Sequence, residues 1–331
     1  MTAGPPERGP SAWVAGDGDL RPEDHSFALC LTHDVDRPYL TYQSVYYGVL
    51  ERSPGRLLDP VLGRNPYWQF DRIRQMESEL GVRSAFYFLD EQRLFRDRPV
   101  WDWLRPEGWM LFAGRYDVDE PAIAELIREL DDGGWEVGLH GSYHSYRDQS
   151  LLREEKRALE AVLGHPVLGG RQHYLNFDPA CTWHNQSRVG LRYDSTIGSS
   201  TEYGFHNGYR PIRLFDDEFV VFPLTLMDQA LPAVRTEPGR AWEECEALLE
   251  EAADNDAVMT VLWHPRRFSE RYFPNYARLY RRLVERALEM GAWVGPPREY
   301  YYSMPGTPAR SELEAATSPG DREPQPGVTD G

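Results

Sequence analysis

Three short segments of the sequence concentrate residue types that bind metal ions or transfer protons. LTHDVD contains Asp34 and Asp36, GLHGSYH contains His140 and His144 four positions apart, and VLWHP contains His264. Two imidazoles and a carboxylate are a common ligand set for zinc and other divalent transition metals, with positions left open for water and substrate. These residues therefore predict a metal centre with acid–base groups beside it.

Each segment also has a structural interpretation. A histidine pair at this spacing is more often a surface or structural feature than a ligand pair. An Asp pair after a strand commonly stabilises a turn, because Asp side chains bond nearby backbone amides. His264 could be a satisfied core histidine. The metal centre is favoured because all three segments follow apolar, strand-like runs, and parallel strands bring their carboxyl ends to one rim.

The elements that would position these residues alternate along the chain. Short apolar runs typical of buried strands alternate with segments of helical periodicity, several of which have Pro near the start or Gly at the end. This alternation predicts parallel strands in an α/β barrel or a doubly wound sheet. The predicted strands are 26–34, 83–90, 135–141, 165–171 and 257–264, and the predicted helices are 70–82, 121–134, 151–164, 241–254 and 275–290.

The domain organisation follows from composition. A chain of 331 residues is compatible with one α/β barrel domain. Residues 1–20 are rich in Pro and Gly, and residues 305–331 are acidic and Pro-rich, so both ends are expected to be disordered. We predict a single catalytic domain over 21–304, interrupted by an aromatic insertion or lid at 92–118.

Charge and cysteine content restrict the partners and the compartment. The formal net charge of −17 argues against nucleic acid and anionic membrane surfaces as partners. Three widely spaced cysteines (Cys30, Cys181 and Cys245) favour a reducing compartment. The sequence has no signal-peptide pattern and no transmembrane run, so we expect a soluble, cytoplasmic protein. The oligomeric state is left open.

Six segments together resemble a known family. SFALCLTHDVD, SAFYFLD, GGWEVGLHGSYHSY, GGRQHYLNFD, YDST and VLWHP occur in the order found in polysaccharide deacetylases, the NodB-like family-4 carbohydrate esterases. The resemblance covers about residues 26–300. It implies a distorted, incomplete (β/α)7-type barrel in a single domain. It also implies removal of N- or O-acetyl groups from sugars with one divalent metal ion, Zn²⁺ first, with Co²⁺, Ni²⁺, Mn²⁺ or Fe²⁺ as alternatives.

The resemblance also implies roles for individual residues. Asp36, His140 and His144 would bind the metal. Asp34 would be the general base, and Arg171 would hold it as a carboxylate.

Five further positions are assigned from the same resemblance. The backbone amide of Tyr174 would contribute to the oxyanion hole, and His264 would be the general acid that protonates the leaving amine. His173, Trp263 and Tyr143 are expected to contact the substrate.

The sequence departs from the commonest family pattern at several positions. The first motif is D-V-D rather than two adjacent aspartates, which leaves open which carboxylate is base and which is ligand. The third motif, R-Q-H-Y, lacks its usual proline, and His173 and His184 are substrate contacts or spare ligands. Asp228 is a candidate to orient His264, although starting a loop is its commoner role, and Asp194 is expected to be structural.

The predicted function is therefore metal-dependent removal of an N-acetyl or other acyl group from a sugar of a polysaccharide or glycan precursor. One alternative keeps the metal site but acts on a non-sugar amide, such as a formamide or a cyclic imide. The other is a glycan-binding relative without turnover. It is disfavoured because every residue of the expected catalytic set is present.

Overall fold

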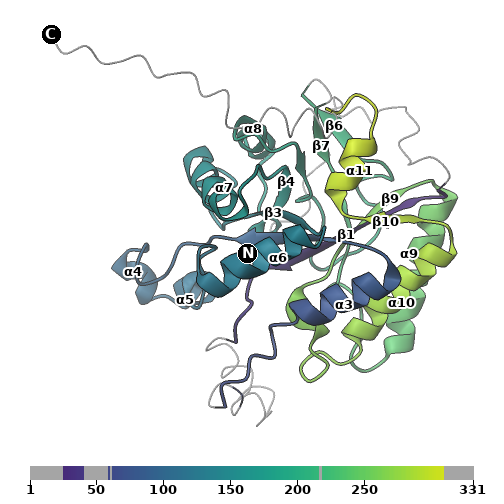
Figure 1. Ribbon diagram of the computed structural model, residues 1–331, viewed down its shortest axis with the longest axis horizontal. Coiled ribbons are helices and arrows are strands. Elements are labelled where there is room, and N and C mark those ends of the chain that lie inside the picture. Colours follow the sequence, from purple (N-terminus) through teal and green to yellow (C-terminus); the bar gives the residue numbers. More distant parts are fainter. Residues whose placement is uncertain (1–24, 41–58, 60–61, 216–217, 309–331) are drawn as a thin grey trace.

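The computed structural model describes residues 25–40, 59, 62–215 and 218–308. The predictions for 1–20, and for the tail beyond 308, lie outside these residues. One sheet of ten strands forms the centre of the described chain (Figure 1). The strands are β1 (Ala28–Val35), β2 (Ala85–Leu89), β3 (Glu136–Gly141), β4 (Gly169–Gln172), β5 (Tyr193–Asp194), β6 (Ile212–Leu214), β7 (Phe219–Val221), β8 (Leu224–Met227), β9 (Val258–Leu262) and β10 (Trp293–Gly295).

The strand order is β6-β7-β5-β4-β3-β2-β1-β9-β8, and β10 pairs with β1. Residues 28–30 of β1 pair with β10, and residues 32–35 pair with β2. Every pairing is parallel except that of β6 with β7. Within the described residues the edge strands β6 and β8 do not pair with each other. The sheet is therefore an incomplete barrel, as predicted.

Helices cover the outer face of this sheet (Figure 1). The helices of the described residues are α3 (Phe70–Leu80), α4 (Val100–Trp103), α5 (Pro106–Phe112), α6 (Pro121–Asp132), α7 (Gln149–Leu163), α8 (Thr182–Arg188), α9 (Pro238–Asp254), α10 (Tyr276–Glu289) and α11 (Pro297–Ser303), with 3-10 helices η1 (His173–Leu175) and η2 (Pro265–Phe268). The five predicted helices correspond to α3, α6, α7, α9 and α10, and the five predicted strands to β1–β4 and β9. Both sets are confirmed.

The alternation of β1 explains how two carboxylates reach the inside of the barrel. Leu29, Leu31 and Val35 belong to the main core between sheet and helices. The intervening residues face the barrel interior, because successive side chains of a strand point to opposite faces. Asp34 is on this inner face, and Asp36 continues the alternation just past the end of the strand.

Aromatic side chains fill part of the barrel interior, away from the carboxyl ends of the strands. Tyr300 and Tyr301 of α11 pack with Tyr193 and Phe222 in a second core cluster. Gly169 admits Tyr193 closely, since a Cβ on this glycine would lie 2.0 Å from the Tyr193 ring. This filling leaves the carboxyl ends of the strands as the open end.

The predicted insertion at 92–118 contains α4 and α5, which project at one side of the molecule (Figure 1). A small core of its own holds this segment together, and includes Leu94, Leu111 and Phe112. Among the residues that the structure describes, no helix combines the length and the apolar character that crossing a bilayer requires.

Candidate metal centre and active site

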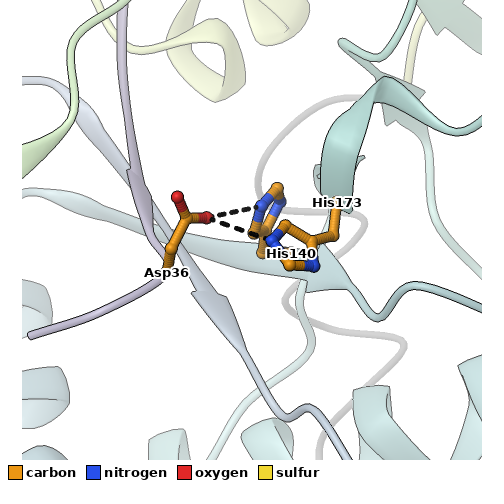
Figure 2. A group of neighbouring side chains, drawn as sticks. All are labelled: Asp36, His140 and His173. Atoms are coloured by element: carbon orange, nitrogen blue, oxygen red, sulfur yellow. Dashed lines mark hydrogen bonds and ion pairs between the residues drawn. The ribbon is translucent and has the colours of Figure 1, made fainter. Parts of the chain in front are cut away.

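Asp36, His140 and His173 form a compact group at the carboxyl ends of β1, β3 and β4. One ligand atom from each lies within 4.8 Å of the other two. Oδ1 of Asp36 is 3.1 Å from Nε2 of His140 and 3.8 Å from Nε2 of His173. Figure 2 shows both rings directed at this carboxylate. Two nitrogens and one oxygen thus converge from the ends of three strands of the same sheet.

The outer nitrogens of both rings are held by other groups. Nδ1 of His140 lies 2.9 Å from the carbonyl oxygen of Arg171, which can only accept, so Nδ1 carries the hydrogen. Nδ1 of His173 lies 3.4 Å from Oε2 of the buried Glu91. Such contacts orient the rings of metal-binding histidines, and they leave Nε2 of each ring as the atom that faces Asp36. The donor set therefore fits a divalent transition metal.

The environment shifts the pKa values of this group in different directions. Burial would lower the pKa of His140, but the charges of Asp34 and Asp36 raise it above its ordinary value. Burial would raise the pKa of Asp36, but the hydrogen bond from His140 and the positive charge that His264, His173 and His140 carry when protonated hold this pKa well below its usual value. Burial lowers the pKa of His173 well below the ordinary value for histidine, and the nearby Arg115 lowers it further. An ionised Asp36 and a neutral His173 are the protonation states that a metal ligand requires.

Asp34 lies beside this group and is clamped by Arg171. Oδ2 of Asp34 is 3.8 Å from Nε2 of His140. Its Oδ1 accepts a hydrogen bond of 2.7 Å from Nη1 of Arg171. The guanidinium is buried, and it also donates to the hydroxyl of Thr32 and to the carbonyl and hydroxyl oxygens of Ser195. The orientation of Asp34 is therefore fixed by a side chain that itself makes four hydrogen bonds.

His264, just after β9, is held by Asp228, just after β8. The Asp228 carboxylate accepts from the His264 backbone N–H (2.7 Å) and from its Nδ1–H (3.0 Å). Nε2 of the same ring lies 3.5 Å from Oδ2 of Asp36. Of the two roles that the sequence suggested for Asp228, the structure supports the orientation of His264.

The segment after β4 has an unusual backbone. Tyr174 and Leu175 have φ angles of 60° and 54°, in the left-handed region that side chains other than glycine rarely adopt. Such a conformation costs about 1–3 kcal/mol per residue and is concentrated at functional sites. The Tyr174 side chain is half-exposed and contacts His173 and Tyr143.

These residues surround a cavity of about 570 Å³ at the open end of the barrel. Asp34, Asp36, His140, His173 and His264 all line it. Tyr174, Leu175 and residues of the 92–118 segment complete part of its wall. A volume of this size accommodates a small-molecule ligand or one to two sugar units.

Comparison with solved structures identifies the fold. A structure from Mycobacterium smegmatis, assigned as a polysaccharide deacetylase, aligns with 90% of this chain and 95% of its own at a TM-score of 0.57 and 20% identity. A second such structure, from Pseudomonas aeruginosa PAO1, aligns with 86% of this chain and 93% of its own at a TM-score of 0.55 and 12% identity. The chain has the polysaccharide deacetylase fold.

The same fold also carries other activities. The allantoinase PuuE aligns with 91% of this chain and 97% of its own at a TM-score of 0.57 and 13% identity. No family model and no curated protein sequence matches the chain. At these identities the likeness establishes the polysaccharide deacetylase fold, while chemistry has to be argued from the site itself.

The structure does not bring His144 to the Asp36 group, contrary to the predicted His140–His144 ligand pair. His140 lies in β3, but His144 lies in the turn after it and is exposed. Its ring stacks on Phe112, with 6.0 Å between ring centroids, and meets Tyr143 edge-on. A four-residue spacing puts two side chains on one face of a helix or of a strand, but β3 ends at Gly141 and the chain turns before His144. His173 occupies the place expected for His144.

Trp263, predicted as a substrate contact, is fully buried and packs against Tyr276 and Tyr280. The polysaccharide deacetylase fold uses it as a core residue here, and we correct that prediction. Tyr143 is partly buried beside Tyr174 but does not line the cavity.

Two other positions named from the sequence, Asp194 and His184, lie away from the metal group. Asp194 accepts hydrogen bonds from Trp183, Gln186 and Thr196, which agrees with a structural role. His184 is exposed and packs on Phe215. The tryptophans of the insertion lie in or next to α4 and α5, and Trp101 and Trp109 are exposed.

Two residues of the site were missed from the sequence. Glu91 lies two residues after the end of β2, and Arg115 lies three residues after the end of α5; both are buried. Glu91 could have been found by the rule that identified Asp34 and His140, because it is a polar residue at the end of a predicted strand (83–90). Arg115 had no comparable signal, because it lies at the end of an irregular insertion.

Proposed function

We propose that this protein is a divalent-metal-dependent hydrolase that removes an N-acetyl or other acyl group from a sugar of a polysaccharide or glycan precursor. The observation that carries the proposal is the pairing of two proton-transfer groups on either side of one candidate metal site. Asp34 is held by Arg171 at 2.7 Å, and His264 is held by Asp228 at 3.0 Å. Amide hydrolysis needs a base for the attacking water and an acid for the leaving amine.

Asp36, His140 and His173 would hold the metal. When bound, a divalent ion of this kind polarises an amide carbonyl and lowers the pKa of water from 15.7 to about 7. The nitrogen-rich ligand set favours Zn²⁺, and it also accepts Co²⁺, Ni²⁺, Mn²⁺ or Fe²⁺.

Asp34 would act as the general base. It must accept a proton, so it must be ionised, and the hydrogen bond from Arg171 stabilises the ionised form. The other oxygen of Asp34, Oδ2, is directed toward His140 and lines the cavity wall with it. This oxygen is therefore available to a water molecule at the metal site.

His264 would donate the proton that the leaving amine needs. An amine leaves poorly as an anion, so a positioned imidazolium contributes about 10²–10⁴ in rate. The Asp228 carboxylate accepts from Nδ1–H, which stabilises the imidazolium and leaves Nε2–H for the substrate.

The backbone N–H of Tyr174 is the proposed oxyanion donor. Its left-handed φ of 60° is an observation that supports a special role for this peptide group, since the conformation is costly. One such donor is worth about 10²–10³ in rate. The half-exposed Tyr174 side chain, which lines the cavity, is proposed to contact the substrate beside this peptide.

The substrate class is tested by hydrolysis. Purified protein loaded with Zn²⁺ is incubated with N-acetylglucosamine, chitotetraose, an N-formylated amine and allantoin, and released acid and amine are measured. Release of acetate from an N-acetylated sugar, abolished in Asp34→Asn and retained in the surface variant Glu154→Gln, is the expected result. Hydrolysis of allantoin or of the formamide, without hydrolysis of any sugar, would instead favour the alternative in which the substrate is a non-sugar amide. Binding of a sugar without turnover would favour the non-catalytic alternative. A cytoplasmic location stays a prediction.

A further inference from the structure

Glu91 contacts both of the chain segments whose histidines compete for one place in the metal site. Its Oε2 accepts a hydrogen bond of 2.8 Å from the backbone N–H of Tyr143, the residue before His144, and lies 3.4 Å from Nδ1 of His173. Glu91 is 2% exposed, so both contacts are shielded from water. One carboxylate oxygen therefore joins the turn after β3 to the ring that follows β4.

Both oxygens of Glu91 are acceptors. Oε2 accepts from Tyr143, and Oε1 accepts from the backbone N–H of Gln92 at 3.1 Å. A carboxylate can accept at both oxygens, whereas the side chain of a glutamine would turn an NH2 group toward one of these N–H donors. An ionised carboxylate also offers no hydrogen to His173, so Nδ1 of that ring is the donor in this contact. Its Nε2 then keeps a lone pair on the side of Asp36.

Arg115 connects Glu91 to a second proposed ligand. Burial raises the pKa of Glu91, and the positive charge of Arg115 acts against this rise. The guanidinium is 5% exposed and donates to the carbonyl oxygens of Asp36 (3.2 Å) and Leu111 (2.5 Å). Arg115 thus links the end of the insertion to the backbone of Asp36 and to the carboxylate beside His173.

The insertion at 92–118 also holds His144 away from the metal group. The ring of His144 stacks on Phe112, which belongs to the small core of the insertion. The guanidinium of Arg98 covers the Phe112 ring at 4.4 Å. Burial and the nearby charge of Arg98 lower the pKa of His144. The segment that starts at Glu91 therefore engages both histidines, one at the metal group and one outside it.

We infer that Glu91 is a positioning residue that selects His173, rather than His144, as the third metal ligand. Its contact with Nδ1 turns Nε2 of His173 toward the cavity, and its bond to Tyr143 fixes the turn that carries His144. Glu91 does not line the cavity, so it acts only through these groups. The inference rests on the metal site of the proposed function. Loss of a carboxylate behind a metal-binding histidine typically lowers metal affinity about 10- to 100-fold.

Metal affinity tests the inference without turnover. The affinity for Zn²⁺ is measured by competition with a chromophoric chelator for the wild type, Glu91→Gln and Glu155→Gln, with circular dichroism to confirm folding. Glu155 is the matched control. It is also 2% exposed, and it accepts from the backbone N–H of Ser142 at 3.1 Å in the same turn. Within the described part of the chain it makes no hydrogen bond or ion pair to a proposed metal ligand.

We expect the affinity to fall about 10- to 100-fold in Glu91→Gln and to stay close to that of the wild type in Glu155→Gln. Equal losses in the two variants would show that the turn after β3, and not the contact with His173, determines metal binding. That result would overturn the inference, as would wild-type affinity in a folded Glu91→Gln protein.

The tautomer of His173 provides a readout that needs neither metal nor substrate. Proton–nitrogen correlation NMR of histidine-labelled, metal-free protein at mildly alkaline pH distinguishes Nδ1–H from Nε2–H, and His173→Gln assigns the signals. We expect Nδ1–H in the wild type and a shift toward Nε2–H in Glu91→Gln. Nε2–H in the wild type would overturn the inference. This measurement decides it even if Glu91→Gln does not fold.

The results separate this inference from the proposed function. Weaker metal binding and a changed tautomer in Glu91→Gln support it even if no acylated sugar is hydrolysed, and only the proposed function then falls. Hydrolysis of an N-acetylated sugar by a Glu91→Gln protein with wild-type metal affinity would leave the proposed function in place and overturn the inference. A wild type that binds no Zn²⁺ would overturn both.

Discussion

Asp228 accepts hydrogen bonds from both the backbone N–H and the Nδ1–H of His264, although the two residues are 36 positions apart. The first bond, of 2.7 Å, fixes the turn after β9, and the second, of 3.0 Å, fixes the ring within that turn. Nε2 consequently faces Asp36 at 3.5 Å. One carboxylate thus sets both the position and the tautomer of the proposed acid.

Replacing Asp228 with Asn should lower kcat by about 10- to 100-fold with little change in KM. The amide keeps the volume but removes the negative charge that stabilises the protonated ring. Steady-state kinetics on the best N-acylated substrate checks this, with circular dichroism to confirm folding. A variant with unchanged kcat and a raised KM would show that Asp228 serves substrate binding instead.

Much of the site was predictable because it lies at the ends of long, regular strands. Asp34, His140 and His264 follow apolar runs whose length and composition identify strands, and parallel pairing brings their ends together. The choice between His144 and His173 was not predictable, since it depends on how each chain segment turns after its strand.

Short elements also escaped the sequence analysis. Strands β5 to β8 and β10 contain only two to four residues, too few to display a two-residue alternation. Asp228 lies directly after β8, so its role could only be suggested. The left-handed conformation of Tyr174 was equally hidden, because no glycine marks that position.

A buried carboxylate on α3 should be a main determinant of stability. Glu77 is fully buried and accepts from four side chains on different elements: His33 (3.0 Å), Ser84 (2.9 Å), Trp135 (2.7 Å) and Tyr280 (2.6 Å). Glu77→Leu would leave these donors unsatisfied and should lower the free energy of unfolding by about 3–5 kcal/mol.

The matched control for this change lies one half-turn away. Glu79 on the same helix forms an exposed ion pair with Arg281 at 2.8 Å, and Glu79→Ala should cost less than about 1 kcal/mol. Urea unfolding of both variants gives the comparison. Similar losses in the two variants would contradict the assignment of Glu77 as a buried structural centre.

Glu136 should make stability depend on pH. Burial raises the pKa of this carboxyl from 4.5 to about 7, and its oxygens accept from Tyr193 and from the backbone N–H of Arg298. The unfolded chain loses this proton near pH 4.5 and the folded chain only near pH 7, so the contribution to stability falls as pH rises between these values. The shift corresponds to about 3 kcal/mol.

Glu136→Gln removes this titration. The slope of the free energy of unfolding against pH, measured by urea denaturation between pH 5 and 7, should be more positive in the variant than in the wild type. Parallel curves for the two proteins over that range would mean that Glu136 is already ionised in the folded state.

The central claim is that Asp36, His140 and His173 form the metal site. Metal content is measured by mass spectrometry after dialysis against Zn²⁺ and removal of free metal, for the wild type and for His140→Ala, His173→Ala and His144→Ala. We predict about one equivalent in the wild type and in His144→Ala, and its loss in the other two variants. Loss of metal in His144→Ala with retention in His173→Ala would contradict the site described here.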